Sequence, residues 1–322
     1  MSTTPQSMPP VLVLVGPTAI GKTALSLQIA DRFGCEIVSV DSMQVYRYMD
    51  IGTAKASIDE RSRVQHHLID IVDPDEQYDA ARFVKDATTA IIAIHQRQKL
   101  PLLTGGTGLY LKALIDGIFE SLPSDHQIRD RLRERLVAEG AARLHQELAA
   151  CDPPSASRIH VNDSQRLLRA LEIYQRTGIP WSSHLHEQQG RAASAAWSGM
   201  LQIGLTCDRQ TLYDRINERC RGMIASGLEQ EVHELLARGY RKDLPSLQSI
   251  GYKHMINYID NTWTSEQMLT YLSRDTRRYA KRQFTWFNGI RELQWYAVDD
   301  FDSIIDRISF WLDELSPRAT NL

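Results

Sequence analysis

One stretch, GPTAIGKT at Gly16–Thr23, constrains the fold of this chain more than any other. It matches the phosphate-binding pattern G-x-x-x-x-G-K-[ST] in full. It follows the uniformly apolar run Val11–Val15, which is typical of a buried parallel strand. After it, Leu25, Ile29 and Phe33 recur at helical spacing. A strand, a glycine-rich turn and a helix in this order predict a loop that holds an anion at the edge of a parallel sheet.

The alternation of apolar runs and helical patterns continues along the chain. EIVSVD and HHLIDIVDP are interpreted as short strands, residues 79–98 as an amphipathic helix, and LPLLTGGTGLYLKAL as a strand, a turn and a helix. Strands that alternate with helices imply parallel pairing. The fold class predicted is therefore α/β, with a parallel sheet like that of P-loop NTPases.

The pattern changes between Asp125 and about Gly178, where only helical spacing is visible. Ser164 is expected to cap one of these helices, and residues 182–199, rich in Ser, Ala, Gly and Gln, are interpreted as a loop or linker. LQIGLT then restores the strand pattern, with Asp208 capping the next helix. We therefore predict an α/β core with C-terminal helices at 9–118 and 200–316, interrupted by an all-helical insertion at 119–199.

Composition sets broad limits on the function. The net charge is −3 and the pI is about 6.4, so charge alone argues neither for nor against a nucleic-acid partner. The four cysteines contain no CxxC pair and suggest neither a metal site nor a disulfide framework. The N-terminus has no signal-peptide pattern, and the first apolar run is too short to span a bilayer. A cytoplasmic protein is expected.

Two further turns are predicted at the same sheet edge as the phosphate loop. Asp41 ends the strand EIVSV, and Ser42 and Gln44 follow it. Ligands of open α/β sheets bind beyond the carboxyl ends of the strands, although an Asp there is also a common turn former. Thr107, in TGGTG, is expected to point its hydroxyl at the bound anion or, alternatively, to cap a helix.

A phosphate loop does not by itself define the reaction. Lys22 supplies a charge and Thr23 a hydroxyl that can ligate Mg²⁺. A small-molecule or nucleoside kinase would use Asp41 to accept a hydroxyl proton, and a non-enzymatic RNA switch would use the loop for a nucleotide. A hydrolytic motor is disfavoured because neither candidate strand ends in an acidic pair.

Basic helices favour an RNA partner. Arg274, Arg278 and Arg282 share one face of a predicted helix, which Trp286 and Phe287 follow, although a solvated face would look the same. A second basic helix lies in the insertion, with residues Arg166, Arg169 and Arg176. On the helix after LQIGLT, Arg215 and Arg219 are both candidates to clamp a diphosphate.

Taken together, these motifs resemble the tRNA dimethylallyltransferases, also called tRNA isopentenyltransferases or IPP transferases. The matching stretches run from near residue 11 to near residue 290: GPTAIGKT, VDSMQVYRYMDIGTAKAS, HHLIDI, TGGTGLYLKAL, RIHVNDSQRLLRALEIYQRTGIP, SIGYKHM and KRQFTWF. The resemblance implies transfer of a dimethylallyl group from dimethylallyl diphosphate, with Mg²⁺, to N6 of the adenine 3′-adjacent to the anticodon. The tRNAs concerned read codons beginning with U.

The resemblance also implies roles for individual residues and partners. Asp41 and Thr107 would be catalytic, and Thr23 would hold Mg²⁺. The diphosphate would lie on Gly16, Pro17, Thr18, Ala19, Ile20, Gly21, Lys22, Thr23 and Arg219. The tRNA anticodon stem-loop would contact the insertion and Ser42, Met43, Gln44, Gln165, Arg166, Leu167, Leu168, Arg169, Gln248, Ser249, Ile250, Gly251, Tyr252, Lys253, Lys281, Arg282, Gln283 and Trp286. A monomer with no membrane partner is expected.

Overall fold

The computed structural model describes residues 9–117, 125–191, 197 and 199–315. The chain divides into two compact units, one within residues 1–114 and 196–322 and the other Ile115–Ala195. These bounds differ by only a few residues from the predicted insertion at 119–199.

Six strands form one parallel sheet in the first unit, in the order β3-β2-β4-β1-β5-β6. The strands are β1 (Val11–Val15), β2 (Cys35–Val40), β3 (His66–His67), β4 (Leu100–Gly105), β5 (Met200–Thr206) and β6 (Gln294–Ala297). Every residue of β1 is buried, as its apolar run predicts. The carboxyl ends of β1, β2 and β4 therefore meet at one edge, and the three predicted turns come together there.

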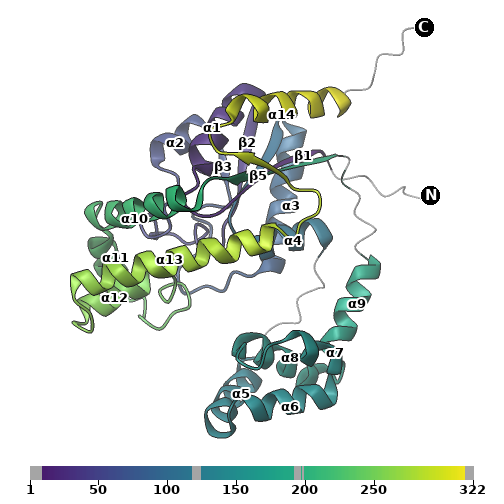
Figure 1. Cartoon of the computed structure of the whole chain (residues 1–322), viewed down its shortest axis with the longest axis vertical. Helices are drawn as coiled ribbons and strands as arrows, with labels where there is room; N and C mark the ends of the chain where they lie inside the picture. Colours follow the sequence, from purple (N-terminus) through teal and green to yellow (C-terminus); the bar gives the residue numbers. More distant parts are fainter. Residues whose placement is uncertain (1–8, 118–124, 192–196, 198, 316–322) are drawn as a thin grey trace. The chain divides into compact units, whose positions relative to one another are not determined.

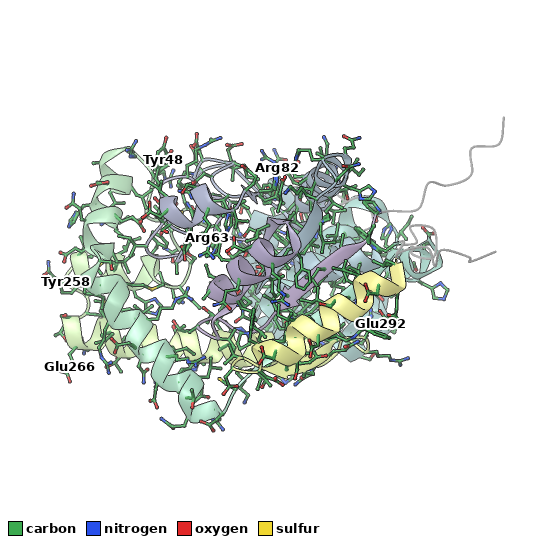
Figure 2. All side chains as sticks on the ribbon, turned by 90° about the horizontal axis from the view of Figure 1, so that it is seen from above. Tyr48, Arg63, Arg82, Tyr258, Glu266 and Glu292 are labelled. Carbon is green, nitrogen blue, oxygen red and sulfur yellow. The ribbon has the colours of Figure 1, made fainter. Side chains whose placement is uncertain are left out.

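Helices cover both faces of this sheet. In Figure 1, α1 and α14 lie above it and α3 and α4 below it. The helices of this unit are α1 (Lys22–Phe33), α2 (Ile58–Arg63), α3 (Ala80–Gln96), α4 (Gly108–Asp116), α10 (Arg209–Ala225), α11 (Leu228–Ala237), α12 (Tyr252–Ile259), α13 (Ser265–Phe287) and α14 (Phe301–Leu315). Figure 2 labels Glu266, in the first turn of α13, and Glu292, beyond its end, on opposite sides of the view, so this helix extends along the unit.

Close approach of two strands explains the glycines of the second turn. A Cβ on Gly105 would overlap the carbonyl of Val40, so β2 and β4 can pair here only through a glycine. Gly106 and Thr107 both donate their N–H groups to the same Val40 carbonyl, at 3.2 and 3.1 Å. The turn is thereby fixed directly beside Asp41.

The second unit is a small helical bundle. It contains α5 (His126–Glu139), α6 (Ala141–Cys151), α7 (Pro153–Arg158), α8 (Ser164–Thr177) and α9 (Trp181–Arg191). Leu132, Leu144, Leu148 and Leu171 are buried in its core. The buried carboxylate of Glu172 accepts a hydrogen bond from the N–H of Asp125 and pairs with Arg129 and Arg169.

Three details of the predicted elements were wrong. Asp163, not Ser164, caps α8, since its carboxylate accepts the N–H of Arg166. Residues 181–191 form α9 rather than a loop. The strand predicted at HHLIDIVDP is reduced to His66–His67. The C-terminal region after β5 is mainly helical, as predicted, and also contains the edge strand β6. The predicted Asp208 cap of α10 is confirmed.

Candidate functional site

The phosphate loop closes around its own lysine. Lys22 Nζ donates hydrogen bonds to the carbonyls of Gly16 and Pro17, both at 2.9 Å. Burial and the neighbouring Arg219 charge lower the pKa of Lys22 to about 7, and the Asp41 carboxylate opposes this shift. A half-buried ammonium group that donates to two carbonyls can turn towards an incoming anion.

A cavity of about 380 Å³ opens beside this loop. Residues of the loop, of the Asp41 turn and of the second glycine turn line it, together with one arginine: Thr18, Ala19, Gly21, Lys22, Thr23, Asp41, Gln44, Gly105, Gly106 and Arg219. The first turn of α1 supplies N–H groups at its wall. The cavity therefore has the charge and the donors that a diphosphate requires.

A second cavity, of about 300 Å³, shares a wall with the first. Five residues line both: Thr18, Asp41, Thr53, Arg219 and Tyr279. The second cavity is also lined by apolar side chains, namely Met43, Met223, Ile250 and Leu272. Asp41 thus lies on the wall between the two cavities. An anion bound in the first cavity and a flatter, less polar group bound in the second would both be next to it.

Asp41 itself is held in a tight turn. Its Oδ1 accepts the N–H of Met43 at 2.8 Å and the N–H of Gln44 at 3.3 Å. The Gln44 side chain accepts from Ser39 Oγ at 3.0 Å and donates to the Ala54 carbonyl at 3.4 Å. The Gln44 amide lines the first cavity, and both of its polar atoms hold neighbouring segments in place.

Gln283 joins the two glycine-rich turns. Its Nε2 donates to the Gly106 carbonyl at 2.9 Å, and its Oε1 accepts the N–H of Thr18 at 2.8 Å. Because a Cβ on Gly106 would overlap this amide, the approach is possible only at a glycine. The side chain is buried. Its predicted role as a tRNA contact is therefore replaced by a role inside the site.

Tyr279 is a site residue that the sequence reasoning missed. Burial and the Asp41 charge raise its pKa, while side-chain hydrogen bonds to Thr107 and Gln283 act against the shift. The Thr107 hydroxyl also accepts the N–H of Ser42 at 3.0 Å. Thr107 therefore sits beside the Asp41 turn, not in the lining of either cavity. Tyr279 lies three residues before Arg282 on the same helix, and this spacing could have indicated that the two side chains share one face.

Of the two candidate arginines, Arg219 lines both cavities. Burial lowers its pKa, and the Asp41 carboxylate counters this. Arg215 instead donates to the Ile20 carbonyl at 3.0 Å, so it supports the phosphate loop from outside. Of these two arginines, Arg219 is therefore the one that lines the first cavity.

Two arginines of the predicted basic face of α13 share one carboxylate with a lysine of α12. Arg274 and Arg278 lie 3.0 and 3.6 Å from the Asp275 carboxylate, as does Lys253 at 3.6 Å. The Nε2 of the buried His254 donates to the same carboxylate at 3.2 Å. Arg282, by contrast, reaches the lining of the second cavity.

The remaining predicted tRNA contacts of this unit lie in different environments. Lys281 and Gln248 are exposed, Trp286 packs against Gly108, and Ser42, Met43, Ser249, Ile250 and Gly251 line the second cavity. Tyr252 is buried, and its hydroxyl donates to Glu231 at 2.6 Å. The prediction that this side chain contacts RNA directly is therefore wrong.

In the helical unit, Gln165 and Arg166 are exposed on α8, whereas Leu167 and Leu168 belong to the buried core. The prediction of a side-chain contact by these two leucines is therefore also wrong, and their role is packing. Arg169 pairs with the buried Glu172 at 3.0 Å.

Neither a membrane span nor an acidic or thiol-rich metal cluster is present in the described part of the chain. Across residues 9–117, 125–191, 197 and 199–315, no helix is both long and apolar enough to cross a membrane. The same residues contain no group of three or more His, Cys, Asp or Glu side chains that could hold a metal ion.

Comparisons with known proteins agree on one family. The model of the family described as IPP transferase matches residues 44–290. A tRNA dimethylallyltransferase from Desulfotalea psychrophila is 56% identical over 305 residues, which cover 95% of this chain and 96% of the relative. A second, from Thermotoga maritima, is 44% identical, with 89% of this chain and 92% of the relative covered.

Solved structures give the same answer. The tRNA isopentenylpyrophosphate transferase from Bacillus halodurans is 41% identical, has a TM-score of 0.69, and matches 95% of this chain and 97% of its own. A eukaryotic dimethylallyltransferase, described as acting on tRNA, has a TM-score of 0.78 at 28% identity, with 97% and 81% covered. This chain belongs to the IPP transferase family, the family of the tRNA dimethylallyltransferases.

Proposed function

We propose that this protein transfers the dimethylallyl group of dimethylallyl diphosphate to N6 of the adenine on the 3′ side of the anticodon, in tRNAs that read codons beginning with U. Relatives covering nearly the whole chain are named for dimethylallyl transfer to tRNA, which favours this function over a small-molecule kinase. The cytoplasm, where tRNA is modified, is the expected place of reaction, and one chain supplies both cavities.

The observation that carries the proposal is the position of Asp41 on the wall that the two cavities share. The diphosphate would bind in the first cavity, on the loop N–H groups, Lys22 and Arg219. The adenine, flipped from its stack, would enter the second cavity between apolar side chains. The amine and the carbon that it attacks would then meet beside a carboxylate.

The reaction follows from this placement. The N6 lone pair forms a bond to C1 of the dimethylallyl group while the C1–O bond breaks and the electron pair leaves with the diphosphate. The Asp41 carboxylate accepts the proton that the amine loses, and later releases it to water. Lys22 and Arg219 stabilise the charge that accumulates on the leaving oxygens.

Thr23 is the residue that would hold Mg²⁺. It lies in the first turn of α1 and lines the first cavity, and its hydroxyl is a suitable hard ligand. Because the described residues contain no acidic cluster for a metal, most ligands of the ion would be diphosphate oxygens. Bound there, Mg²⁺ would offset charge on the leaving group.

For the tRNA itself, the exposed cations Arg166, Lys281 and Arg282 are proposed to contact the anticodon stem-loop, with Arg282 guiding the flipped base towards the second cavity. The helical unit would contribute through Gln165 and Arg166 of α8.

The test is direct. The protein is incubated with unmodified tRNA, Mg²⁺ and either dimethylallyl diphosphate or ATP. The tRNA is then digested, and its nucleosides are identified by mass spectrometry. Dimethylallyl adenosine should form only with the isoprenoid, and only when the adenine beside the anticodon is present. Consumption of ATP with phosphorylation of a small acceptor would show that the protein is a kinase instead.

A further inference from the structure

We propose that Glu231 is a positioning residue for the transfer reaction, acting through its hold on the loop Asp50–Ala54. The proposal rests on the function proposed above. Glu231 belongs to α11 and lines neither cavity. Its influence would come from fixing the wall of both.

The carboxylate of Glu231 is engaged by three consecutive backbone groups of the loop. Its oxygens accept the N–H of Asp50 at 2.9 Å, of Ile51 at 2.7 Å and of Gly52 at 3.1 Å. The Tyr252 hydroxyl adds a fourth hydrogen bond at 2.6 Å. Hydrogen bonds to an ionised carboxylate are stronger than those between neutral groups. One side chain thus fixes a loop that lies about 180 positions away in sequence.

The loop Asp50–Ala54, which Glu231 holds, forms part of both cavities. Gly52 lines the second cavity, Ala54 the first, and Thr53 both. The Ala54 carbonyl accepts from Gln44, whose N–H is held by Asp41. The loop therefore connects the Glu231 carboxylate to the turn that presents the proposed base.

The loop conformation needs this external support. Ala54 has a φ of +46°, in the left-handed region that a non-glycine residue adopts only when the surroundings hold it there. The Tyr252 ring also packs so closely on Gly52 that a Cβ there would overlap it. Glu231 and Tyr252 together hold the loop in one position.

Loss of the hydrogen bonds from the loop to Glu231 should affect the chemical step more than substrate binding. The hydrogen bonds of Glu231 go to the Asp50–Gly52 backbone and to Tyr252 rather than to the phosphate loop, and the cations proposed to bind tRNA lie on α8 and α13. A displaced wall would leave the diphosphate and the tRNA bound, but misalign the amine and the carbon beside Asp41. A misplacement of about 1 Å can cost on the order of 100-fold in rate.

The experiment compares Glu231→Gln and Glu231→Ala with Glu229→Gln in the full chain. Glu229 is an exposed carboxylate of the same helix whose partner is His233 at 4.0 Å, so it matches the loss of charge without touching the loop. Single-turnover rate constants are measured with saturating enzyme and dimethylallyl diphosphate, and a separate burst experiment with excess tRNA gives the active fraction. Tyr252→Phe removes only the fourth hydrogen bond.

Glu231→Ala should lower the single-turnover rate constant by about 10- to 100-fold and Glu231→Gln by less, with tRNA and diphosphate dissociation constants within about threefold of wild type. Glu229→Gln should match the wild type. Amide hydrogen exchange should become faster at Asp50, Ile51 and Gly52 in the Glu231 variants. If Glu231→Ala does not fold, Glu231→Gln and Tyr252→Phe carry the comparison.

An unchanged rate constant per active site, with faster loop exchange, would overturn the proposal, and so would a loss seen only in the burst amplitude or in the dissociation constants. If the wild-type protein forms no dimethylallyl adenosine, the proposed function is refuted instead. The hydrogen-exchange data would still show whether Glu231 holds the loop Asp50–Ala54.

Discussion

The side-chain oxygen of Gln283 accepts the backbone N–H of Thr18 at 2.8 Å, across 265 positions of sequence. Because the amide nitrogen of the same side chain donates to Gly106, one residue of α13 sets the spacing between the two glycine-rich turns. The phosphate loop is therefore not a free-standing motif in this protein. It is tied to the second turn, beside which Asp41 lies.

Replacing Gln283 with Leu should separate these turns. The side chain is buried, and its loss leaves the Gly106 carbonyl and the Thr18 N–H without their partner. The unpaired buried carbonyl costs about 1–3 kcal/mol, and the half-buried N–H costs less. We expect a lower midpoint of urea unfolding and a KM for dimethylallyl diphosphate raised by about tenfold. Gln248→Leu, on an exposed side chain, is the control. A normal KM in a destabilised Gln283 variant would show that the bridge serves stability alone.

Local patterns in the sequence predicted the features that determine the site. The strands before the phosphate loop, Asp41 and TGGTG are apolar runs that end in glycine or polar turns, and parallel pairing brings their carboxyl ends to one edge. For this reason the proximity of Asp41, Lys22 and Gly106 could be predicted from the order of these runs and turns alone.

The errors arise where a distant segment decides the outcome. Residues 181–191 are polar, but the Asp152 carboxylate accepts the N–H of Ser182 at 2.9 Å and so supports the start of α9 from 30 positions away. Leu167 and Leu168 share a motif with exposed cations, yet the bundle buries them. The hold of Glu231 on Asp50–Gly52 likewise has no local signal.

The substitution Asp41→Asn removes the basicity of this side chain while keeping its size and its place in the turn. The variant keeps the Oδ1 atom that accepts the Met43 and Gln44 N–H groups, but an amide does not take a proton from the attacking amine. We expect turnover to fall by about 10²- to 10⁴-fold, with tRNA affinity within a few fold of wild type. Single-turnover kinetics and filter binding measure the two quantities. A collapse of tRNA affinity with normal chemistry would show that Asp41 is not the base.

Binding of the diphosphate should take up a proton above pH 7. With a pKa of about 7 in the free protein, Lys22 is largely neutral at pH 8, and the bound anion favours its charged form. The dissociation constant should therefore rise as pH increases through 7, by at most about tenfold per pH unit. Calorimetry in buffers of different ionisation enthalpy measures the proton uptake.

Lys22→Arg is the control for this pH dependence, because arginine stays charged and the ionisation of the ligand itself is common to both proteins. The wild type should take up more protons at pH 8 than Lys22→Arg, and the two should converge near pH 6. Identical proton uptake in both proteins at pH 8 would mean that Lys22 is already charged before the anion arrives.

Arg282 and Arg274 lie two turns apart on α13 but should differ in their effect on tRNA. Arg274 is tied to Asp275 at 3.0 Å, whereas Arg282 lines the second cavity and lies over the Tyr279 ring, with 5.7 Å between its guanidinium carbon and the ring centroid. Arg282→Ala should weaken tRNA binding and reduce the slope of log K against log salt by about 1, since one fewer phosphate contact releases fewer counterions. Arg274→Ala should leave the slope nearly unchanged because Arg274 is held by Asp275 and lines neither cavity. Equal slopes for both variants, measured by filter binding between low and physiological salt, would place Arg282 away from the RNA backbone.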